Sequence, residues 1–208
     1  GAMKKNSTLR ELKVREREVR RDLIIDAARK VFGTKTYDKV SMQEIANEAG
    51  IAKSSIYTYF QNQEDLFVEA AYRDTGRFVS ELERKIEAAP ERAAFGTLVD
   101  EFIDYCTVNA IYWKMITRFS LHGEISNASA RKLDVVARRF MDMLDRVFGD
   151  ETDPDRQRLF SHALFAALSG ILIAFRKYPG RSAEESLAHM KKIGQLFEGM
   201  FAAYRSSG

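Results

Sequence analysis

A cation and several hydroxyl groups are clustered within seven residues, near the end of the first third of the chain. They are Lys53, Ser54, Ser55, Thr58 and Tyr59. An ammonium group can pair with a phosphate, and hydroxyl groups can bond to base edges or to phosphate oxygens. If this stretch is a helix with an apolar inner face, the cluster predicts binding in the major groove of double-stranded DNA.

A short helix and a glycine turn are expected to lead into this segment. Ser41 and Glu44 have the spacing of a capping box, so a helix should begin there. Ile45 and Ala49 share one of its faces. Gly50 stands where this helix must stop, because glycine adopts the left-handed conformation at little cost.

The next segment is predicted to be a second short helix that is anchored by Ile56, Tyr57 and Phe60 at helical spacing. The pair is therefore a helix-turn-helix. The same spacing also describes many helical hairpins that do not bind DNA, so this pattern alone leaves both interpretations open.

Residues 20 to 70 go further and resemble the DNA-binding domain of the tetracycline-repressor (TetR) family. The resemblance rests on five matched elements at fixed spacing: Ile25-x-Ala27-Ala28-x-x-x-Phe32, Tyr37-Asp-Lys-Val-Ser41, Ile45-Ala46-x-x-Ala49-Gly50-Ile51, Ile56-Tyr57-x-Tyr59-Phe60 and Glu64-Asp65-Leu66. It implies that Lys39, Ser41, Tyr57 and Gln63 meet phosphates. Gln63 stands where the family usually has a lysine, and Ala52 where a serine often caps the recognition helix.

Composition predicts an all-α protein, and the helical segments along the chain number about nine. The TetR resemblance implies a three-helix DNA-binding domain and a helical ligand-binding and dimerisation domain. The chain has 208 residues, 45% of them hydrophobic, and three prolines. The expected parts are a charged arm with a cloning scar (1–17), the helix-turn-helix domain (18–61) and the effector and dimer domain (62–208). Residues 4 to about 18 could be a disordered arm, an arm that reaches a minor groove or an extension of the first helix, and disorder in the absence of DNA is the favoured interpretation. Leu23, Ile24, Ala27, Ala28 and Val31 are expected to form the core stripe of the first helix.

Charge and cysteine content add two further expectations. Residues 1–61 carry 13 Lys or Arg against 8 Asp or Glu, and this basic excess is what phosphate neutralisation requires. The single cysteine, Cys106, indicates a reducing cytoplasm. The most apolar stretch, 159–175, is interpreted as a buried helix that is too short for a membrane span.

No motif for catalysis, for a cofactor or for a metal ion is found in the sequence. There is no nucleotide-binding loop, nucleophile elbow or H-E-x-x-H, and the three histidines lack metal-ligand spacing. We therefore expect no enzyme activity, no cofactor and no metal site.

The middle of the chain is rich in aromatic residues and methionine, as either a core or a pocket for an apolar effector would be. The TetR resemblance implies a pocket. Its candidate residues are Phe78, Phe102, Tyr105, Trp113, Arg118, Phe119, His122, Met141 and Phe165. Arg118 would either pair with an acid group of the effector or form a surface salt bridge.

The last two helices are predicted to form a homodimer through a two-fold four-helix bundle, and internal packing is the alternative. The candidate interface residues are Ala163, Ala167, Gly170, Ala174, Phe197 and Phe201. The function that follows is a dimeric, DNA-binding transcriptional regulator, a repressor released from a palindromic operator by an apolar small molecule. A helical-bundle enzyme or lipid carrier with an incidental helix-turn-helix remains the alternative.

Overall fold

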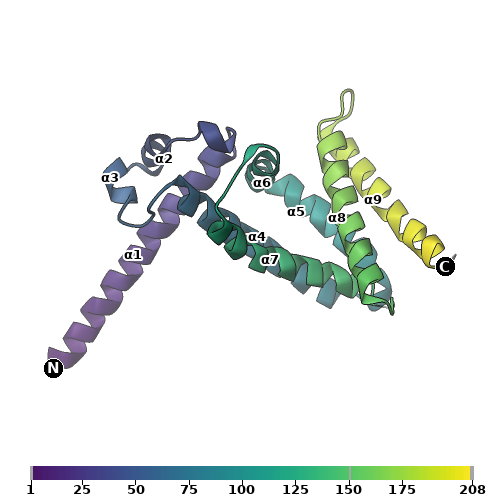
Figure 1. Ribbon diagram of the computed structural model, residues 1–208, viewed down its shortest axis with the longest axis horizontal. Helices are drawn as coiled ribbons and strands as arrows, with labels where there is room; N and C mark the ends of the chain where they lie inside the picture. The colour runs from purple at the N-terminus through teal and green to yellow at the C-terminus, as the bar shows by residue number, and fades with distance from the viewer. Residues whose placement is uncertain (1, 150, 207–208) are drawn as a thin grey trace. The chain divides into compact units, whose positions relative to one another are not determined.

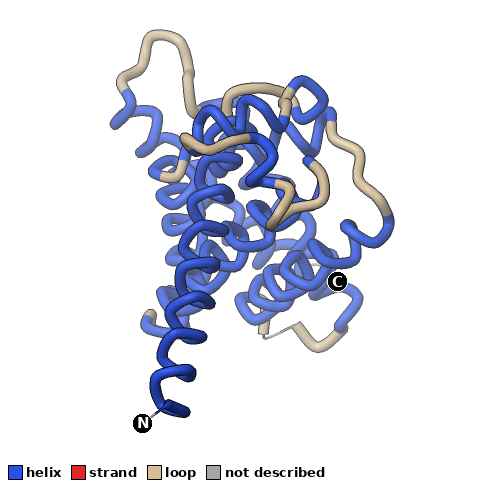
Figure 2. Tube along the Cα trace, turned by 90° about the vertical axis from the view of Figure 1, so that its left-hand side faces the viewer, coloured by secondary structure: helices blue, strands red, loops and turns tan. Residues whose placement is uncertain are grey.

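The computed structural model describes residues 2–149 and 151–206. This part of the chain is made of helices joined by loops and contains no strand (Figures 1 and 2). In chain order the elements are α1 (Ala2–Phe32), the 3-10 turn η1 (Tyr37–Lys39), α2 (Met42–Ala49), α3 (Lys53–Ile56), α4 (Gln63–Ala88), η2 (Glu91–Ala93), α5 (Ala94–Val108), α6 (Ala110–His122), α7 (Asn127–Val147), α8 (Pro154–Phe175) and α9 (Ala183–Ser206). The prediction of an all-α fold with about nine helices is confirmed.

The helices form two compact units, and the chain passes between them more than once. The first unit contains Gly1–Arg73 and Ile111–Leu133, and the second contains Asp74–Ala110 and Asp134–Gly208. The sequence predicted a single boundary near residue 62, whereas α4 and α7 each begin in the first unit and continue into the second.

Helix α1 extends much further toward the N-terminus than expected. The disorder predicted for residues 4 to about 18 is wrong, because α1 runs through them. Its Arg, Glu, Lys and Leu residues are good helix formers, and Glu16 and Arg20 form an i,i+4 ion pair at 2.6 Å. Burial of α1 begins only near Ile24, which is 1% exposed, whereas Leu23 is 58% exposed and does not belong to the core stripe.

The helix-turn-helix forms as its local signals predict. The Ser41 side chain accepts a hydrogen bond from the backbone N–H of Glu44, and the Glu44 side chain accepts one from the backbone of Ser41. Gly50 adopts the left-handed conformation at φ 68° and caps the end of α2. The second helix, α3, has only four residues and no side-chain cap at Ala52.

A group of four aromatic rings holds the first unit together. Phe67 of α4 packs against Phe32, Tyr37 and Phe119, with ring centroids 5.1, 5.2 and 4.3 Å away. Phe67 is 1% exposed. The group therefore joins the end of α1, the turn before α2 and the start of α4 to α6.

The second unit is built largely on α5, α8 and α9, which pack on one another. Gly194 of α9 marks their closest approach, since a Cβ placed there would lie 2.5 Å from Cγ1 of Val99. Helix α8 has 22 residues, and by length and composition it could cross a membrane, so the expectation that this stretch is too short is wrong. Only 33% of its most apolar window is buried within the chain.

Candidate DNA-binding surface and effector site

The recognition segment has one buried side and one open side. Ile56 and Phe60 are buried, at 0% and 3% exposure, and anchor the segment to α1 and α2. The predicted contacts on the opposite side are exposed, namely Lys53, Ser54, Ser55 and Thr58. Tyr57 is also exposed, at 47%, so the prediction that it anchors the helix is wrong. With only four helical residues in α3, Tyr57 follows a tighter turn than helical spacing assumes.

Two arginines of α1 lie against the end of this segment. The Arg17 guanidinium lies 5.5 Å from the centre of the Tyr59 ring, and it donates a hydrogen bond to the carbonyl of Thr58 at 3.5 Å. The Arg21 guanidinium lies 5.3 Å from the centre of the Phe60 ring. Cation–π contacts of this kind support the segment from the α1 side. The sequence analysis gave neither arginine a role.

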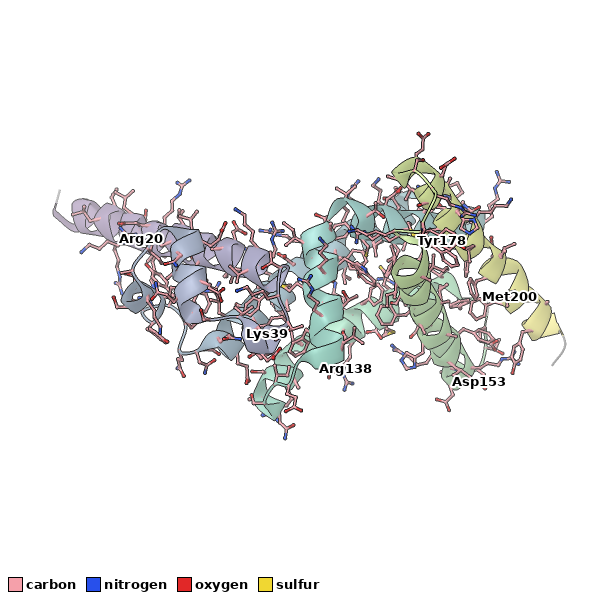
Figure 3. All side chains as sticks on the ribbon, turned by 90° about the horizontal axis from the view of Figure 1, so that it is seen from above. Arg20, Lys39, Arg138, Asp153, Tyr178 and Met200 are labelled. Carbon is pink, nitrogen blue, oxygen red and sulfur yellow. The ribbon has the colours of Figure 1, made fainter. Side chains whose placement is uncertain are left out.

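The candidate phosphate contacts are in different environments. Lys39 and Ser41 are exposed, and Lys39 is labelled in Figure 3. Gln63 is half-buried, and its Nε2 donates a hydrogen bond to the carbonyl of Tyr37 at 2.7 Å. Its amide thus ties the start of α4 to the turn before α2, which explains why an uncharged residue can serve there structurally.

The starts of α4 and α7 are joined by hydrogen bonds within the first unit. The Glu64 carboxylate accepts hydrogen bonds from the backbone N–H and hydroxyl of Ser126 and from the hydroxyl of Ser129. These bonds lower the pKa of Glu64 below its ordinary value. One turn later, Glu69 pairs with both Arg21 and Lys132. The sequence offered no signal for this connection, because its partners are more than 45 residues apart.

Four of the predicted effector residues meet in the second unit. The rings of Phe78 and Phe102 lie 5.4 Å apart, and those of Phe78 and Tyr105 lie 4.6 Å apart. Phe102 and Phe165 are separated by 6.4 Å. Phe140, which the sequence did not single out for the pocket, lies between them, 5.7 Å from Phe78 and 5.4 Å from Phe165. We call these five residues the aromatic cluster.

The aromatic cluster lies beside charged groups at Tyr105 and is exposed to solvent at Phe165. Burial, followed by the negative charges of Asp74 and Glu81, raises the pKa of Tyr105 to about 12, while the Arg77 guanidinium acts in the opposite direction. Asp74 is only 3% exposed. Phe165 is 37% exposed and gives the cluster an open edge.

The other predicted effector residues do not join this cluster. Arg118 donates a hydrogen bond to the carbonyl of Gly33 within the first unit, and no salt bridge of Arg118 is found among the described residues. Phe119 belongs to the aromatic group of the first unit. Trp113 is buried on α6, also in the first unit, and Met141 is half-buried on α7. The His122 side chain lies outside the described part of the structure. Helical position alone could not assign α6 to the first unit.

The predicted dimer residues separate into two groups. Ala163, Gly170 and Ala174 are exposed and Ala167 is half-buried, which gives α8 an open stripe of small residues. Phe201 instead packs within its own unit, 5.0 Å from Phe148 and 5.2 Å from Phe160. Phe197 is half-buried, 6.5 Å from Phe201.

Exposed large apolar residues complete the open side of these two helices. Leu159 and Ile173 of α8 are 61% and 66% exposed, and Leu196 and Met200 of α9 are 62% and 60% exposed. Met200 is labelled in Figure 3. We call these four residues, with the small-residue stripe of α8, the α8–α9 apolar face. The sequence analysis missed the four large residues because periodicity marks an apolar side chain without naming what covers it.

The described residues offer neither a metal-binding cluster nor a reactive thiol. No cluster of three metal-ligating side chains occurs in the residues that were searched, which are the described ones. Cys106 is buried, and burial raises the pKa of its thiol to about 12. A thiol in this state is a poor nucleophile at neutral pH.

The fold and the exposed recognition segment define an all-helical protein with an N-terminal helix-turn-helix. Residues 24–70 match the family described as bacterial regulatory proteins, tetR family. This part of the chain is therefore a DNA-binding domain of that family, and the resemblance seen in the sequence is confirmed.

Relatives and solved structures agree with this assignment. The Fatty acid metabolism regulator protein of Bacillus subtilis (strain 168) is 36% identical over 64 residues, which are 31% of this chain and 33% of that protein. An uncharacterized HTH-type transcriptional regulator of Mycobacterium tuberculosis (strain CDC 1551 / Oshkosh) is 27% identical over 95% of each chain. The structure of the transcriptional regulator FadR from Bacillus subtilis in complex with stearoyl-CoA has a TM-score of 0.67 at 20% identity. It covers 84% of this chain and 95% of that one.

Proposed function

We propose that this regulator binds a palindromic DNA operator as a homodimer. The observation that carries the proposal is the two-sided recognition segment, with Ile56 and Phe60 buried and Lys53, Ser54 and Ser55 presented outward. A short, well-anchored helix that exposes a cation and hydroxyl groups suits the major groove. Two copies related by a two-fold axis would bind half-sites about one helical turn apart or somewhat more.

Selection from genomic fragments followed by one matched pair of variants tests the DNA proposal. Lys53→Ala should weaken binding to the selected site by about 1–3 kcal/mol and leave thermal stability unchanged. Lys114→Ala removes an equally exposed lysine from α6 and should change neither property. Failure to recover any palindromic site at low salt would favour the alternative of an enzyme or carrier with an incidental helix-turn-helix.

The second copy would cover the α8–α9 apolar face. A helix as apolar as α8, with two thirds of its window uncovered in the single chain, needs either lipid or another protein surface. Its small residues favour close helix packing, and the rest of the second unit packs as a water-soluble bundle. Gly170→Trp should disrupt the dimer, because nothing in the single chain lies within 4 Å of a Cβ at Gly170. Sedimentation showing an intact dimer, or recovery of the wild type with membranes, would contradict this interface.

The effector would bind at the aromatic cluster of the second unit. Its rings are in mutual contact, so a ligand would have to enter at Phe165 and separate them. An apolar chain with an acid or phosphate group suits this site, with Arg77 beside Tyr105 as the cation in place of Arg118. The stearoyl-CoA of the related FadR structure and the name of the Bacillus subtilis relative support a long-chain acyl compound.

Release of DNA would follow from a preference of the effector for one arrangement of α4. This helix is continuous from Gln63 in the first unit to Ala88 in the second. A coupling of about 1–3 kcal/mol is typical for such regulators. Thermal-shift measurements with stearic acid and stearoyl-CoA, followed by operator titrations, test this. A compound that stabilises the protein but leaves operator affinity unchanged is a ligand without being the effector.

A further inference from the structure

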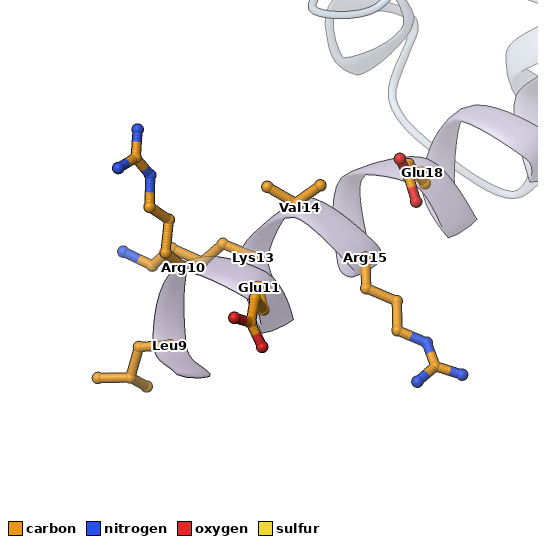
Figure 4. A pocket seen from close by; sticks show the side chains of 7 residues that line it. All are labelled: Leu9, Arg10, Glu11, Lys13, Val14, Arg15 and Glu18. Atoms are coloured by element: carbon orange, nitrogen blue, oxygen red, sulfur yellow. The ribbon is translucent and has the colours of Figure 1, made fainter. Parts of the chain in front are cut away.

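Residues 8–20 of α1 form a charged and exposed stretch of helix, of which Arg17 contacts the recognition segment. Residues 8–20 are all exposed, and the part of the helix that packs into the core begins only at Ile24. Figure 4 shows seven of these side chains pointing outward in several directions from a single helix. Because one convex helix supplies all of them, this is an open surface rather than a ligand cavity.

The whole basic excess of the DNA-binding third of the chain lies in residues 1–21. Residues 1–21 contain eight Lys or Arg and three Glu, a net charge of +5. Residues 22–61, which include the complete helix-turn-helix, contain five Lys or Arg and five Asp or Glu, a net charge of zero. Residues 22–61 therefore add no net charge, and the excess of positive charge lies in the N-terminal part of α1.

Three cations of α1, namely Arg10, Lys13 and Arg17, are arranged along one face of the helix. Arg10, Lys13 and Arg17 follow one another at spacings of three and four residues, so they lie on the same side. Arg17 marks the direction of that side, because its guanidinium lies over Tyr59 at the end of the recognition segment. Lys13 and Arg10 extend the same face beyond Arg17 by about one and two turns, or roughly 6 and 10 Å.

The character of this face favours DNA over a membrane or another protein. No ion pair of Arg10 or Lys13 is found among the described residues, whereas Arg20 is paired with Glu16. Leu9, Leu12 and Val19 share another side of the helix, but Glu16 stands among them, so no continuous apolar stripe is available for insertion into lipid. DNA carries about one charge per 1.7 Å of axis, which cations at these spacings can meet.

We propose that the Arg10–Lys13–Arg17 face of α1 binds the sugar-phosphate backbone beside the half-site, and that it supplies most of the electrostatic part of DNA binding. This inference rests on the proposed DNA binding by α3. It assigns affinity and specificity to different helices, with phosphate contacts from α1 and base contacts from α3.

A pair of chemically identical substitutions tests this proposal in the full chain. Arg10→Gln removes a charge from the proposed face. Arg15→Gln removes the same charge from the other side of the helix, where Figure 4 shows its side chain pointing away from Arg10 and Lys13. Glutamine keeps the helix propensity, so circular dichroism should not change. Affinity is measured by fluorescence anisotropy on a duplex carrying the selected site and about ten flanking base pairs, at several KCl concentrations.

Arg10→Gln should reduce the slope of log K against log[KCl] by about 0.9, and Arg10→Gln combined with Lys13→Gln by about twice that. At about 0.1 M salt each lost contact should weaken binding roughly eightfold. The control Arg15→Gln should change the slope by less than half as much. The loss should be the same on a random-sequence duplex, because phosphate contacts carry no sequence information.

The outcomes separate this inference from the proposed function. If the wild type binds no DNA, the proposed function fails and this inference fails with it. If the wild type binds a selected site but Arg10→Gln and Arg15→Gln have equal slopes, only this inference is overturned. Loss of binding to phosphatidylglycerol vesicles with an unchanged DNA slope would assign the face to a membrane and would also overturn it.

Discussion

Each of the two units of this protein has its own group of packed aromatic rings, but the surroundings of the two groups differ. In the first unit, Phe67 is enclosed by rings from α1, η1 and α6, and the turns on either side are set by local caps. In the second, Phe201 packs on Phe148 and Phe160 while the neighbouring α8–α9 apolar face stays uncovered. The first unit therefore has a covered aromatic core, whereas part of the apolar surface of the second unit stays exposed in the single chain.

The largest difference between the units is expected for deletion of their central rings. Phe67→Ala should reduce the free energy of unfolding by about 3–5 kcal/mol, because it leaves a cavity among three other rings. Phe201→Ala should reduce the free energy of unfolding by roughly half as much, because the Phe201 ring is only half-buried and its removal leaves a smaller cavity. Urea unfolding followed by circular dichroism measures both. Equal losses would show that the second unit is as tightly packed as the first.

Two glycines of the second unit separate its inner and outer sides. Gly194→Ala should cost about 1–3 kcal/mol, because the new methyl group would lie 2.5 Å from Cγ1 of Val99. Gly170→Ala meets nothing within 4 Å in the single chain and should stabilise the monomer by up to about 1 kcal/mol. Thermal unfolding at low protein concentration provides the comparison. A large loss at Gly170 would mean that its face is covered within the chain.

The capping boxes give a matched comparison, since each unit contains one. In Ser41→Ala and in Ser182→Ala, the serine that caps the helix is lost, and each should cost about 1 kcal/mol. Only Ser41→Ala should also weaken DNA binding, because Ser41 lies at the proposed phosphate surface. Paired measurements of unfolding and operator affinity check this. An equal loss of affinity in both variants would point to an indirect effect of stability.

The smallest expected effect is a dependence of the first unit on pH. Hydrogen bonds from Ser126 and Ser129 lower the pKa of Glu64 in the folded state, so the carboxylate stabilises the fold above its ordinary pKa of 4.5. That contribution is lost as the pH falls through the lower, folded-state value. The difference in melting temperature between wild type and Glu64→Gln should therefore be present at pH 6 and shrink toward pH 3. A constant difference would show that the charge of Glu64 contributes nothing.

Local signals were enough to predict the helix-turn-helix of the first unit, as individual residues show. The Ser41–Glu44 capping box and the left-handed Gly50 each depend on a few neighbouring residues, and both are found in the structure. Burial of Ile56 and Phe60 follows from the same short range. Tyr57 and Leu23 were misplaced because helical periodicity was extended past the end of a helix or onto its exposed side.

The sequence by itself determined the helical class, the position of the recognition motif and the residues that this motif exposes, because helix caps and turns act within about four residues. Only the tertiary structure decided that Arg118 binds the carbonyl of Gly33, that Phe119 belongs to the first unit and that Phe201 faces inward. The tertiary structure also decided that α1 extends toward the N-terminus as a charged helix, beyond its part that packs in the helix-turn-helix domain. The physical reason is that an apolar or charged side chain specifies burial or exposure, whereas its partner depends on segments distant in sequence.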